Sequence, residues 1–518
     1  MEHIDIIEAF ENIVSEYTDA PKVFVKLAGY WVASSTLGRY VLDILSPNFR
    51  RPNLFIILSS IPGRTRRSMV LSLAKSVYRR ALLKFFKLRQ YPQGAVSDVE
   101  YEKAISDTIL EEGTAEGITD HLQNVETYHV HTTNITGESR LFSPEPRPIV
   151  PETFVMINPE IGNFFLRMQG QTYLTNVFTL FSKLYDGEGG RMYLSHRGRG
   201  QPRRYLPWNI YFTCLGAMQE PNLYLDDFMV RQGLMRRILL TYYNVKKPEK
   251  QQELKERWKS SWSESRIELQ NELNALGDYV GERMYDLDNI CRRNKEPIKA
   301  LFTPKALERA ELIERGFDEK VVANPDLRNL YRQSYPEKIV KMTILKALCR
   351  KWVDSDGTLL VEESESGATF GDFTEPIEIV KSIGSDVDEA LMTLRIRPAT
   401  IETEENLQEL IEYYVQAAGK EGVSLSELCR RLKLRDVNRI MDALKTFLVP
   451  EGTDKMPKIV IEFTQKKTRG RPRYMVFIHT NYLKGDEAYK IISRYPENFK
   501  QWIAGEGELP PISANGKE

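Results

Sequence analysis

Hydrophobic positions along the first part of the chain predict helices followed by a strand. Apolar residues recur at helical spacing from residue 5 to 45, and the run SPNFRRPN at 46–53 ends this pattern. The next apolar run, NLFIIL at 53–58, is short and bounded by turn residues, as in a buried strand. Residues 66–86 are again amphipathic at helical period. The pattern therefore predicts a helical lead-in, then a strand, a loop and a helix.

Three further apolar runs predict the rest of a sheet. They occupy 153–157, 209–218 and 236–245, and helical patterns separate them. Strands that alternate with helices are typical of a mostly parallel sheet covered on both faces, so we expect an α/β fold. A length of 518 residues indicates several domains. Changes in composition suggest six segments: a helical lead-in at 1–50, an α/β core at 51–250, a helical extension at 251–355, a linker or small element at 356–400, a small domain at 401–484 and a tail at 485–518.

The small domain at 401–484 has the pattern of a winged helix. Helical patterns cover 406–422 and 424–448, SLSE at 424–427 is a capping box, and a third helix should begin near Asp436. Two β-rich runs, 458–464 and 474–480, then flank a turn. Helices followed by a β-hairpin indicate a DNA-binding winged helix. The third helix turns outward three residues of types that contact bases or phosphates: Asn438, Arg439 and Lys445.

Two basic loops are candidate DNA contacts. The turn of the expected hairpin contains RGRP, which resembles the minor-groove-inserting segment of AT-hook peptides, and its cations are Lys466, Lys467, Arg469, Arg471 and Arg473. The alternative is a solvated hairpin tip in a winged helix that binds protein. A second loop, SHRGRGQPRRY at 195–205, precedes the 209–218 strand and offers Arg197, Arg199, Arg203 and Arg204 to a phosphate backbone. A surface loop or a subunit contact is the alternative there.

Charge and cysteine usage limit the classes of function. The chain has 72 basic and 72 acidic residues, so no global field attracts it to nucleic acid or membrane, and any basic surface is local. The acidic amino terminus has no leader pattern and no apolar run approaches eighteen residues, which predicts a cytoplasmic protein without a membrane partner. The four cysteines are scattered singly, and His129 and His131 lack an evident third ligand, so we assign no metal site to protein ligands.

The loop between the first strand and its helix stands where a phosphate loop belongs. Such a loop needs glycines that let backbone N–H groups close on phosphate, a lysine, and a Ser or Thr for magnesium. Aligned with the pattern G-x-x-x-x-G-K-[ST], Ile61 takes the first glycine and only Ser68 matches outright. The strand before and the helix after supply the context that the motif requires. The candidate phosphate-binding residues are Gly63, Arg64, Thr65, Arg66, Arg67 and Ser68.

Several segments, in this order, resemble a poorly characterised family of RecA/AAA+-like P-loop ATPases associated with primases, helicases and the replication of plasmids, viruses and integrated elements. The segments are GYWVASSTLGR, NLFIILSSIPGRTRRS, EEGTAEGITDHL, FVMINPEIGNFF, LTNVFTLFSKLYDGEGG, FTCLGAMQEPNLYL and RQGLMRRILLTY, over roughly residues 20 to 350. The resemblance implies ATP and Mg²⁺ as cofactors and a homo-oligomeric ring, with a hexamer as one expected size. It assigns the acidic motif to Glu160, a polar sensor to Gln219 with Glu220, and the trans-acting arginine to Arg236 or Arg237.

Two hypotheses follow for the function. The first is a DNA-binding, helicase-like ATPase of replication or mobile-element maintenance, in which hydrolysis drives translocation. The second is a catalytically inactive P-loop scaffold that binds DNA as a replication accessory, nucleoid organiser or regulator, because Arg66, Arg67 and Pro159 replace the usual glycine, lysine and aspartate. A protein-interaction adaptor without a nucleic-acid role is a third alternative.

Overall fold

The chain forms two units, Met1–Arg395 and Ile396–Glu518, each with its own hydrophobic core. The structure is a computed structural model, and the two units are considered separately below. It describes residues 4–43, 45, 51–60, 65–90, 97–110, 118, 121–122, 150–169, 175–187, 190–191, 205–206, 210–221, 225, 229, 233–243, 262–323, 327–351, 353–363, 371–392, 407–408, 410–412, 414–415, 423–432, 437–448, 459–464, 473–478, 490–495 and 497–505.

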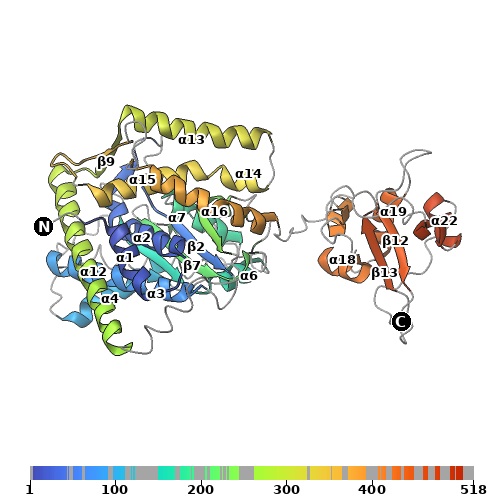
Figure 1. Ribbon diagram of the computed structural model, residues 1–518, viewed down its shortest axis with the longest axis horizontal. Helices are drawn as coiled ribbons and strands as arrows, with labels where there is room; N and C mark the ends of the chain where they lie inside the picture. The colour runs from blue at the N-terminus through green and yellow to red at the C-terminus, as the bar shows by residue number, and fades with distance from the viewer. Residues whose placement is uncertain are drawn as a thin grey trace, which may run out of the picture. The chain divides into compact units, whose positions relative to one another are not determined.

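A five-stranded parallel sheet lies at the centre of the first unit (Figure 1). Its order is β3-β4-β7-β2-β8, and all four neighbouring pairs are parallel. The prediction of an α/β fold with a parallel sheet is therefore confirmed. All six residues of β2 are buried, because helices cover both faces of the sheet. The strands are β2 (Phe55–Ser60), β3 (Ile109–Leu110), β4 (Glu152–Asn158), β7 (Ile210–Met218) and β8 (Ile238–Tyr243).

Neighbouring residues of β7 show which helices cover which face. The Tyr211 hydroxyl donates to the Ser34 carbonyl of α2 at 3.0 Å, whereas the next ring, Phe212, lies 5.9 Å from Phe181 of α7. Successive side chains of a strand point to opposite faces, so α2 and α7 cover opposite sides of the sheet. The helices of this region are α1 (Ile6–Tyr17), α2 (Lys22–Leu37), α3 (Arg67–Arg89), α4 (Asp98–Asp107), α6 (Ile161–Gln169), α7 (Thr175–Asp186) and α10 (Leu234–Arg237).

The expected helical lead-in is part of the first unit and not a separate segment. Thirteen of the sixteen residues of α2 are buried, as in a helix enclosed by a core. After the short helix η1 (Gly38–Tyr40), β1 (Val41–Asp43) pairs in parallel with β9 (Ile298–Phe302), which pairs with β10 (Thr358–Val361). This second sheet joins the lead-in to the helical extension and to the segment expected as a linker. The boundaries expected at 50, 250 and 355 therefore do not separate units; the unit boundary lies at 395.

The helical extension packs against α3, the helix that follows the candidate phosphate loop. Its first helix, α12, runs along α3 at the side of the first unit (Figure 1). Gly277 and Gly281 form the close contact, because a Cβ at Gly281 would lie 2.6 Å from the Ala81 carbonyl oxygen of α3. Arg80 of α3 also makes two hydrogen bonds to Asp278, of 2.7 and 2.6 Å. The helices are α12 (Trp262–Asn294), α13 (Pro304–Ala323), α14 (Leu327–Arg332), α15 (Tyr335–Arg350) and α16 (Thr374–Met392).

Two of these helices satisfy the outer edge of β8. The Tyr331 hydroxyl of α14 accepts from the Leu240 backbone N–H at 2.8 Å and donates to the Ile238 carbonyl at 2.9 Å. The Lys338 ammonium of α15 donates to the same carbonyl at 2.6 Å, and burial lowers the pKa of Lys338 well below its ordinary value. These contacts occupy polar groups of the β8 edge with which a further strand would have to pair.

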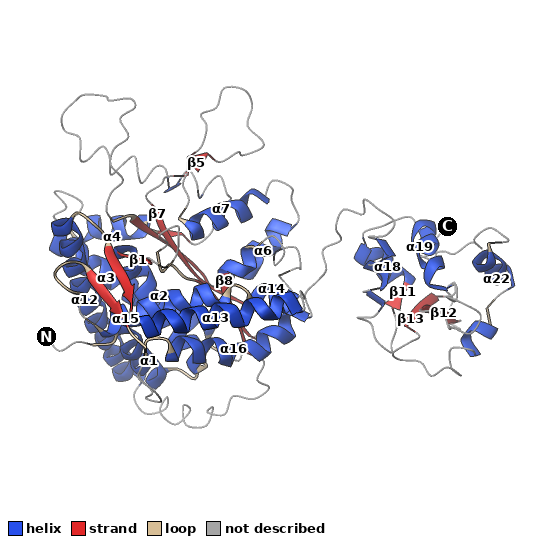
Figure 2. Cartoon of the chain, turned by 90° about the horizontal axis from the view of Figure 1, so that it is seen from above, coloured by secondary structure: helices blue, strands red, loops and turns tan. Residues whose placement is uncertain are grey.

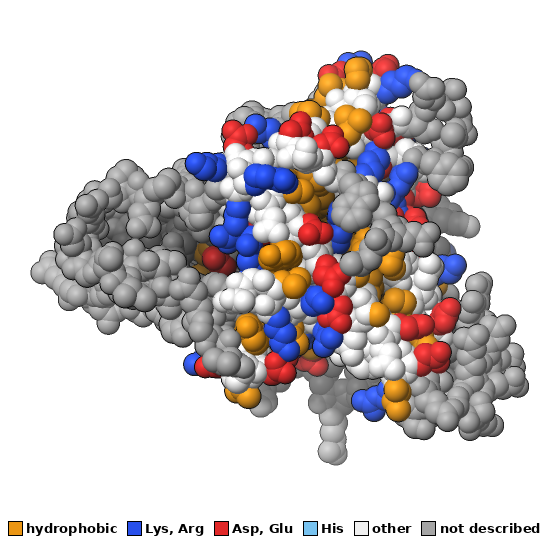
Figure 3. Space-filling view, turned by 90° about the vertical axis from the view of Figure 1, so that its left-hand side faces the viewer, with side chains coloured by type: hydrophobic (Ala, Val, Ile, Leu, Met, Phe, Trp, Pro, Cys, Tyr) orange, Lys and Arg blue, Asp and Glu red, His pale blue; other side chains and the backbone are white. Residues whose placement is uncertain are grey.

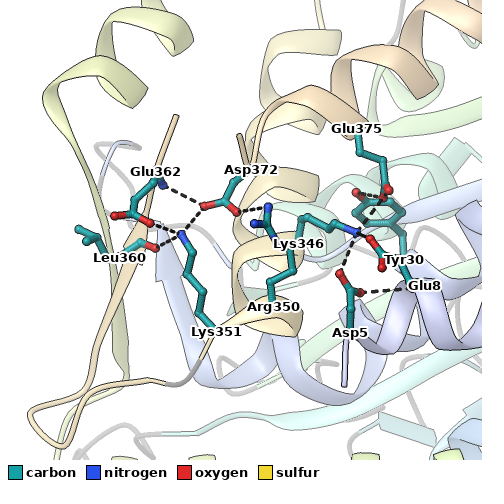
Figure 4. A network of polar contacts seen from close by, with 10 residues as sticks. All are labelled: Asp5, Glu8, Tyr30, Lys346, Arg350, Lys351, Leu360, Glu362, Asp372 and Glu375. Carbon is teal, nitrogen blue, oxygen red and sulfur yellow. Dashed lines mark hydrogen bonds and ion pairs between the residues drawn. The ribbon is translucent and has the colours of Figure 1, made fainter. Parts of the chain in front are cut away.

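A buried ion-pair network ties the ends of the first unit together (Figure 4). The Lys346 side chain is 5% exposed and lies 2.8 Å from Asp5, 3.0 Å from Glu8 and 3.3 Å from Glu375. The Tyr30 hydroxyl donates to Glu375 at 2.7 Å. Because these residues come from α15, α16, α2, α1 and the N-cap of α1, the network joins four helices from the two ends of the first unit.

The second unit combines helices with a three-stranded antiparallel sheet of order β11-β13-β12. Its third helix begins at Val437, one residue after the expected start. Part of the expected tail belongs to the core, since Tyr495, Phe499 and Trp502 are buried there. The elements are β11 (Val423–Ser424), α18 (Leu425–Leu432), α19 (Val437–Leu448), β12 (Ile459–Thr464), β13 (Arg473–Ile478) and α22 (Glu497–Ala504).

Surface charge is mixed where it is described. On the face of the molecule in Figure 3, Lys and Arg side chains alternate with Asp and Glu, with apolar side chains between them. Figure 2 shows that helices predominate around the strands. Within the described ranges, no helix is both long and apolar enough to cross a membrane.

Candidate phosphate site at the carboxyl edge of the sheet

The ends of β2, β4 and β7 meet at one edge of the central sheet. These strands are neighbours, in the order β4-β7-β2. Asn158, the last residue of β4, is level with Gly216 of β7, which is level with Ile57 of β2, and Glu160 follows two residues after that strand end. Neighbouring strands are about 4.8 Å apart, which puts the Asn158 backbone about 10 Å from β2. The phosphate-loop, acidic and sensor candidates therefore share one edge, where α/β folds commonly bind ligands.

The candidate phosphate loop is closed by contacts between its two ends. The hydroxyls of Ser60 and Thr65 are hydrogen-bonded to each other, and both residues are buried. Arg67, where the motif has lysine, donates from Nη1 to the Ser60 carbonyl at 3.0 Å. Ser68 is exposed on the first turn of α3. Gly63 and Arg64 lie outside the described residues.

Arg66 has the backbone conformation that a glycine adopts without strain. Its φ of 42° and ψ of 33° are left-handed, and it is the N-cap of α3. Left-handed backbone at a side-chain-bearing residue costs on the order of 1–3 kcal/mol and recurs at binding sites. The phosphate-loop pattern assigns its second glycine to this position. Arg66 also forms an ion pair, with its Nε 2.7 Å from Oδ1 of Asp19.

Glu160 lies at the start of α6 with its side chain exposed. Its backbone N–H donates to Oδ1 of Asn158 at 2.8 Å, and its carboxylate accepts from Nδ2 of Asn163 at 2.8 Å. Asn158 is the last residue of β4 and is buried. The polar side chain at the end of β4 is therefore the amide of Asn158. The motif alignment, which compared the usual aspartate with Pro159, did not identify it.

The polar sensor candidates follow β7 directly. Gln219 is exposed and Glu220 is half-buried. The Ser59 hydroxyl of β2 donates to the Gln219 backbone carbonyl, which ties the two strand ends together. The Gln219 side chain is thus available at the same edge as Glu160.

The trans-acting arginine candidates lie at the opposite edge. Both belong to α10, which precedes β8, and the first residue of β8 is level with Phe55. Five residue steps, about 17 Å, separate that level from Ser60 at the other end of β2. Arg237 is held inside the chain, with Nη2 2.5 Å from Oδ2 of Asp186. Arg236 is half-buried and makes no hydrogen bond or ion pair with the described part of the chain.

The DNA-contact candidates are described only in part. Asn438 is exposed and Arg439 is half-buried on α19. Lys445 lies over the ring of Trp502 from α22, 5.2 Å from its centroid, so this cation is partly engaged within the unit. Arg473 begins β13, and its side chain lies outside the described part. The same holds for the other basic-loop residues, namely Arg197, Arg199, Arg203, Arg204, Lys466, Lys467, Arg469 and Arg471.

Strand pairing frames both basic loops. β5 (Gly190–Arg191) pairs antiparallel with β6 (Tyr205–Leu206), and the arginine-containing segment joins them. β12 and β13 pair antiparallel from Ile459 with Ile478 to Thr464 with Arg473. Each basic segment is therefore the connection of a β-hairpin.

Sequence reasoning missed two carboxylates that pair with candidate residues. Asp19 pairs with Arg66 and Asp186 pairs with Arg237, but neither stands in a motif. A weak signal was available for Asp186, which lies inside the resembling segment LTNVFTLFSKLYDGEGG. Asp19 has no such signal, because its partner is 47 positions away.

Comparisons with known proteins add no assignment. No protein-family model matches the sequence, and no curated protein matches it. Among the described residues, no group of three or more His, Cys, Asp or Glu side chains is arranged to hold a metal ion.

Proposed function

We propose that the chain is a DNA-binding, helicase-like protein of the P-loop ATPase class that acts as a ring in DNA replication or mobile-element maintenance. The observation that carries the proposal is the shared edge of the sheet. A left-handed residue at the second-glycine position, Glu160 and Gln219 follow three adjacent parallel strands there. This arrangement supports a nucleotide site built from the 61–68 loop.

Backbone geometry supports phosphate binding despite the altered side chains. A left-handed residue followed by helical residues turns successive N–H groups toward one point, which is a common anion-binding arrangement. Here Arg66 is left-handed and Arg67 begins a 23-residue helix. The positive end of that helix favours an anion further. In this proposal Ser68 holds Mg²⁺ and Glu160 orients the attacking water.

The position of Arg236 supports a ring. It lies at the far edge from the loop of its own chain, so it can serve only the nucleotide of a neighbouring subunit. Arg237 is bonded to Asp186 and to the Gly233 carbonyl, which makes it the residue that fixes α10. We therefore assign the trans-acting role to Arg236.

The second unit supports DNA binding. Its three antiparallel strands, with α18 and α19 between β11 and β12, have the element order of a winged helix. In this proposal α19 enters the major groove and the basic turn contacts the minor groove.

A second candidate is the catalytically inactive DNA-binding scaffold. The bonds of both loop arginines within the chain favour it, since Arg67 binds the Ser60 carbonyl and Arg66 binds Asp19. Neither guanidinium then meets a γ-phosphate without breaking a contact.

Nucleotide binding and hydrolysis, measured with and without DNA, separate the two candidates. The ATPase predicts DNA-stimulated hydrolysis that Glu160→Gln abolishes and Arg67→Lys preserves or raises. Glu296→Gln is the control, because that exposed glutamate pairs only locally with Lys299. Nucleotide binding without turnover in every variant would favour the scaffold and remove the motor.

A mixing experiment tests the ring. Arg236→Ala and Glu160→Gln subunits are each expected to be inactive alone. Mixed rings should regain activity, because some interfaces combine an intact Glu160 with an intact neighbouring Arg236. If mixtures stay inactive while wild type is active, Arg236 does not act in trans.

Charge reversal tests the DNA contact. Reversing Arg469, Arg471 and Arg473 should weaken DNA binding and lower the slope of log affinity against log salt by roughly one unit for each phosphate that the variant no longer neutralises. Lys500→Glu on α22 is the control, since Lys500 pairs locally with Glu497. Unchanged binding by the triple variant would place the DNA contact elsewhere.

A further inference from the structure

Asp19 lies beside the candidate phosphate loop without belonging to it. It stands in the turn between α1 and α2, where the Thr18 hydroxyl accepts from the Ala20 N–H at 3.2 Å. Its side chain is only 9% exposed, whereas Arg66 is 45% exposed. The Asp19 carboxylate is therefore nearly buried, whereas the Arg66 guanidinium that pairs with it is exposed to solvent.

The ion pair is not needed to hold α3 in place. Further along the same helix, Arg80 binds Asp278 with two hydrogen bonds and Lys84 lies 2.9 Å from Glu282, both partners belonging to α12. Arg79 also pairs with Glu102 of α4. Of these four ion pairs, that between Asp19 and Arg66 lies at the start of α3, next to the loop.

We propose that Asp19 is a latch that lowers the affinity of the turn at Arg66 and the first residues of α3 for nucleotide phosphate. This inference rests on the proposed nucleotide site. Asp19 competes with phosphate for the guanidinium of Arg66, and its negative charge stands next to the place where phosphate charge would bind. Nucleotide binds only when Arg66 leaves Asp19, so the apparent affinity falls by the fraction of released loops. Arg66 is the mobile partner because it is the exposed one.

The test measures the affinity of the full chain for ATP and ADP by titration calorimetry. Asp19→Asn keeps the shape of the side chain and removes its charge, and it should tighten binding by up to about fivefold, the upper range for an ion pair with an exposed partner. Asp19→Glu restores the charge and should return the affinity toward the wild-type value. Asp278→Asn is the matched control, because it breaks another Arg–Asp pair of α3 about 20 Å along the helix.

A double variant isolates the route through Arg66. In an Arg66→Ala background the latch has no cation to hold, so Asp19→Asn should add much less tightening than it does in wild type. An undiminished effect in that background would overturn the latch and leave only charge repulsion.

The outcomes separate the latch from the proposed function. Wild-type binding that Asp19→Asn leaves unchanged or weakens overturns the latch and retains the nucleotide site. Binding by Asp19→Asn but not by wild type supports both the site and the latch. If no variant binds nucleotide, both the nucleotide site and the latch are overturned.

Discussion

The close contact between α12 and α3 predicts that glycine-to-alanine substitution changes the free energy of unfolding in opposite directions at Gly281 and Gly316. At Gly281 an added Cβ would lie 2.6 Å from the Ala81 carbonyl oxygen and 2.6 Å from the Lys84 Cβ. At Gly316, in α13, an added Cβ meets nothing within 4 Å. Both residues lie inside helices, so the intrinsic preference for alanine applies equally to each.

The magnitude follows from two opposing terms. Alanine is favoured over glycine in a helix interior by about 1 kcal/mol. Gly316→Ala should therefore raise the free energy of unfolding by about that amount. Forcing an extra methyl group into a close contact costs about 1–3 kcal/mol. At Gly281 the methyl group would meet the Ala81 carbonyl oxygen, a backbone atom of α3 that cannot rotate away as a side chain can. Gly281→Ala should thus lose about 1 kcal/mol, which leaves the two variants about 2 kcal/mol apart.

Equilibrium urea unfolding of both full-length variants measures this difference as a shift of the midpoint. Because the chain has two units, the comparison uses the unfolding transition of the first unit. The first unit is the larger one, so its transition has the larger denaturant slope. If Gly281→Ala stabilises the protein as much as Gly316→Ala does, α12 and α3 are not in close contact and the reasoning is refuted.

Three further predictions concern the polar groups that anchor the first unit. Tyr331→Phe should cost about 1–3 kcal/mol in urea unfolding, because the Leu240 N–H loses its acceptor, whereas Tyr335→Phe should cost little, since the buried Tyr335 hydroxyl has no partner among the described residues. Lys346→Met should cost about 3 kcal/mol by the same measurement, because it leaves the Asp5 carboxylate, 12% exposed, without its cation, and a loss below about 0.5 kcal/mol would contradict this. Burial acts to raise the pKa of Glu375, but Lys346 and other partners outweigh it and the net pKa is lowered. Glu375 therefore stabilises the fold above its unfolded pKa of about 4.3 and loses that contribution as the pH falls, so Glu375→Gln should flatten the acid decline of stability measured by thermal melting.

The main strands were predictable from the sequence because their signal is local. β2 is buried along its length and β7 from Tyr211 onward, so apolar residues predominate in each. The second parallel sheet was not predicted. It joins Val41–Asp43, Ile298–Phe302 and Thr358–Val361, three short segments separated by more than fifty residues each. Pairing between short distant strands depends on tertiary contacts, which a local pattern does not contain.

The candidate site was predictable in position and less so in its contacts. Strand, loop and helix located the 61–68 loop, and the resemblance assigned Glu160 and Gln219, which follow the ends of two strands. The partner of Arg66 was not predictable, because an ion pair over 47 positions leaves no spacing in the sequence. The same limit left Arg236 and Arg237 equivalent until the bond from Arg237 to Asp186 distinguished them.

The loop also shows why matching residue by residue underestimates a site made by backbone. A phosphate loop binds through N–H groups, so its essential requirement is a conformation, and the second glycine serves that requirement. At Arg66 the left-handed conformation is present without the glycine. The loop thus has the backbone arrangement of the motif, while Arg66 and Arg67 bring two guanidinium groups that already contact Asp19 and the Ser60 carbonyl. Phosphate at such a loop must displace these contacts, so we expect its affinity to depend on Asp19 in a way that a glycine-lysine loop cannot show.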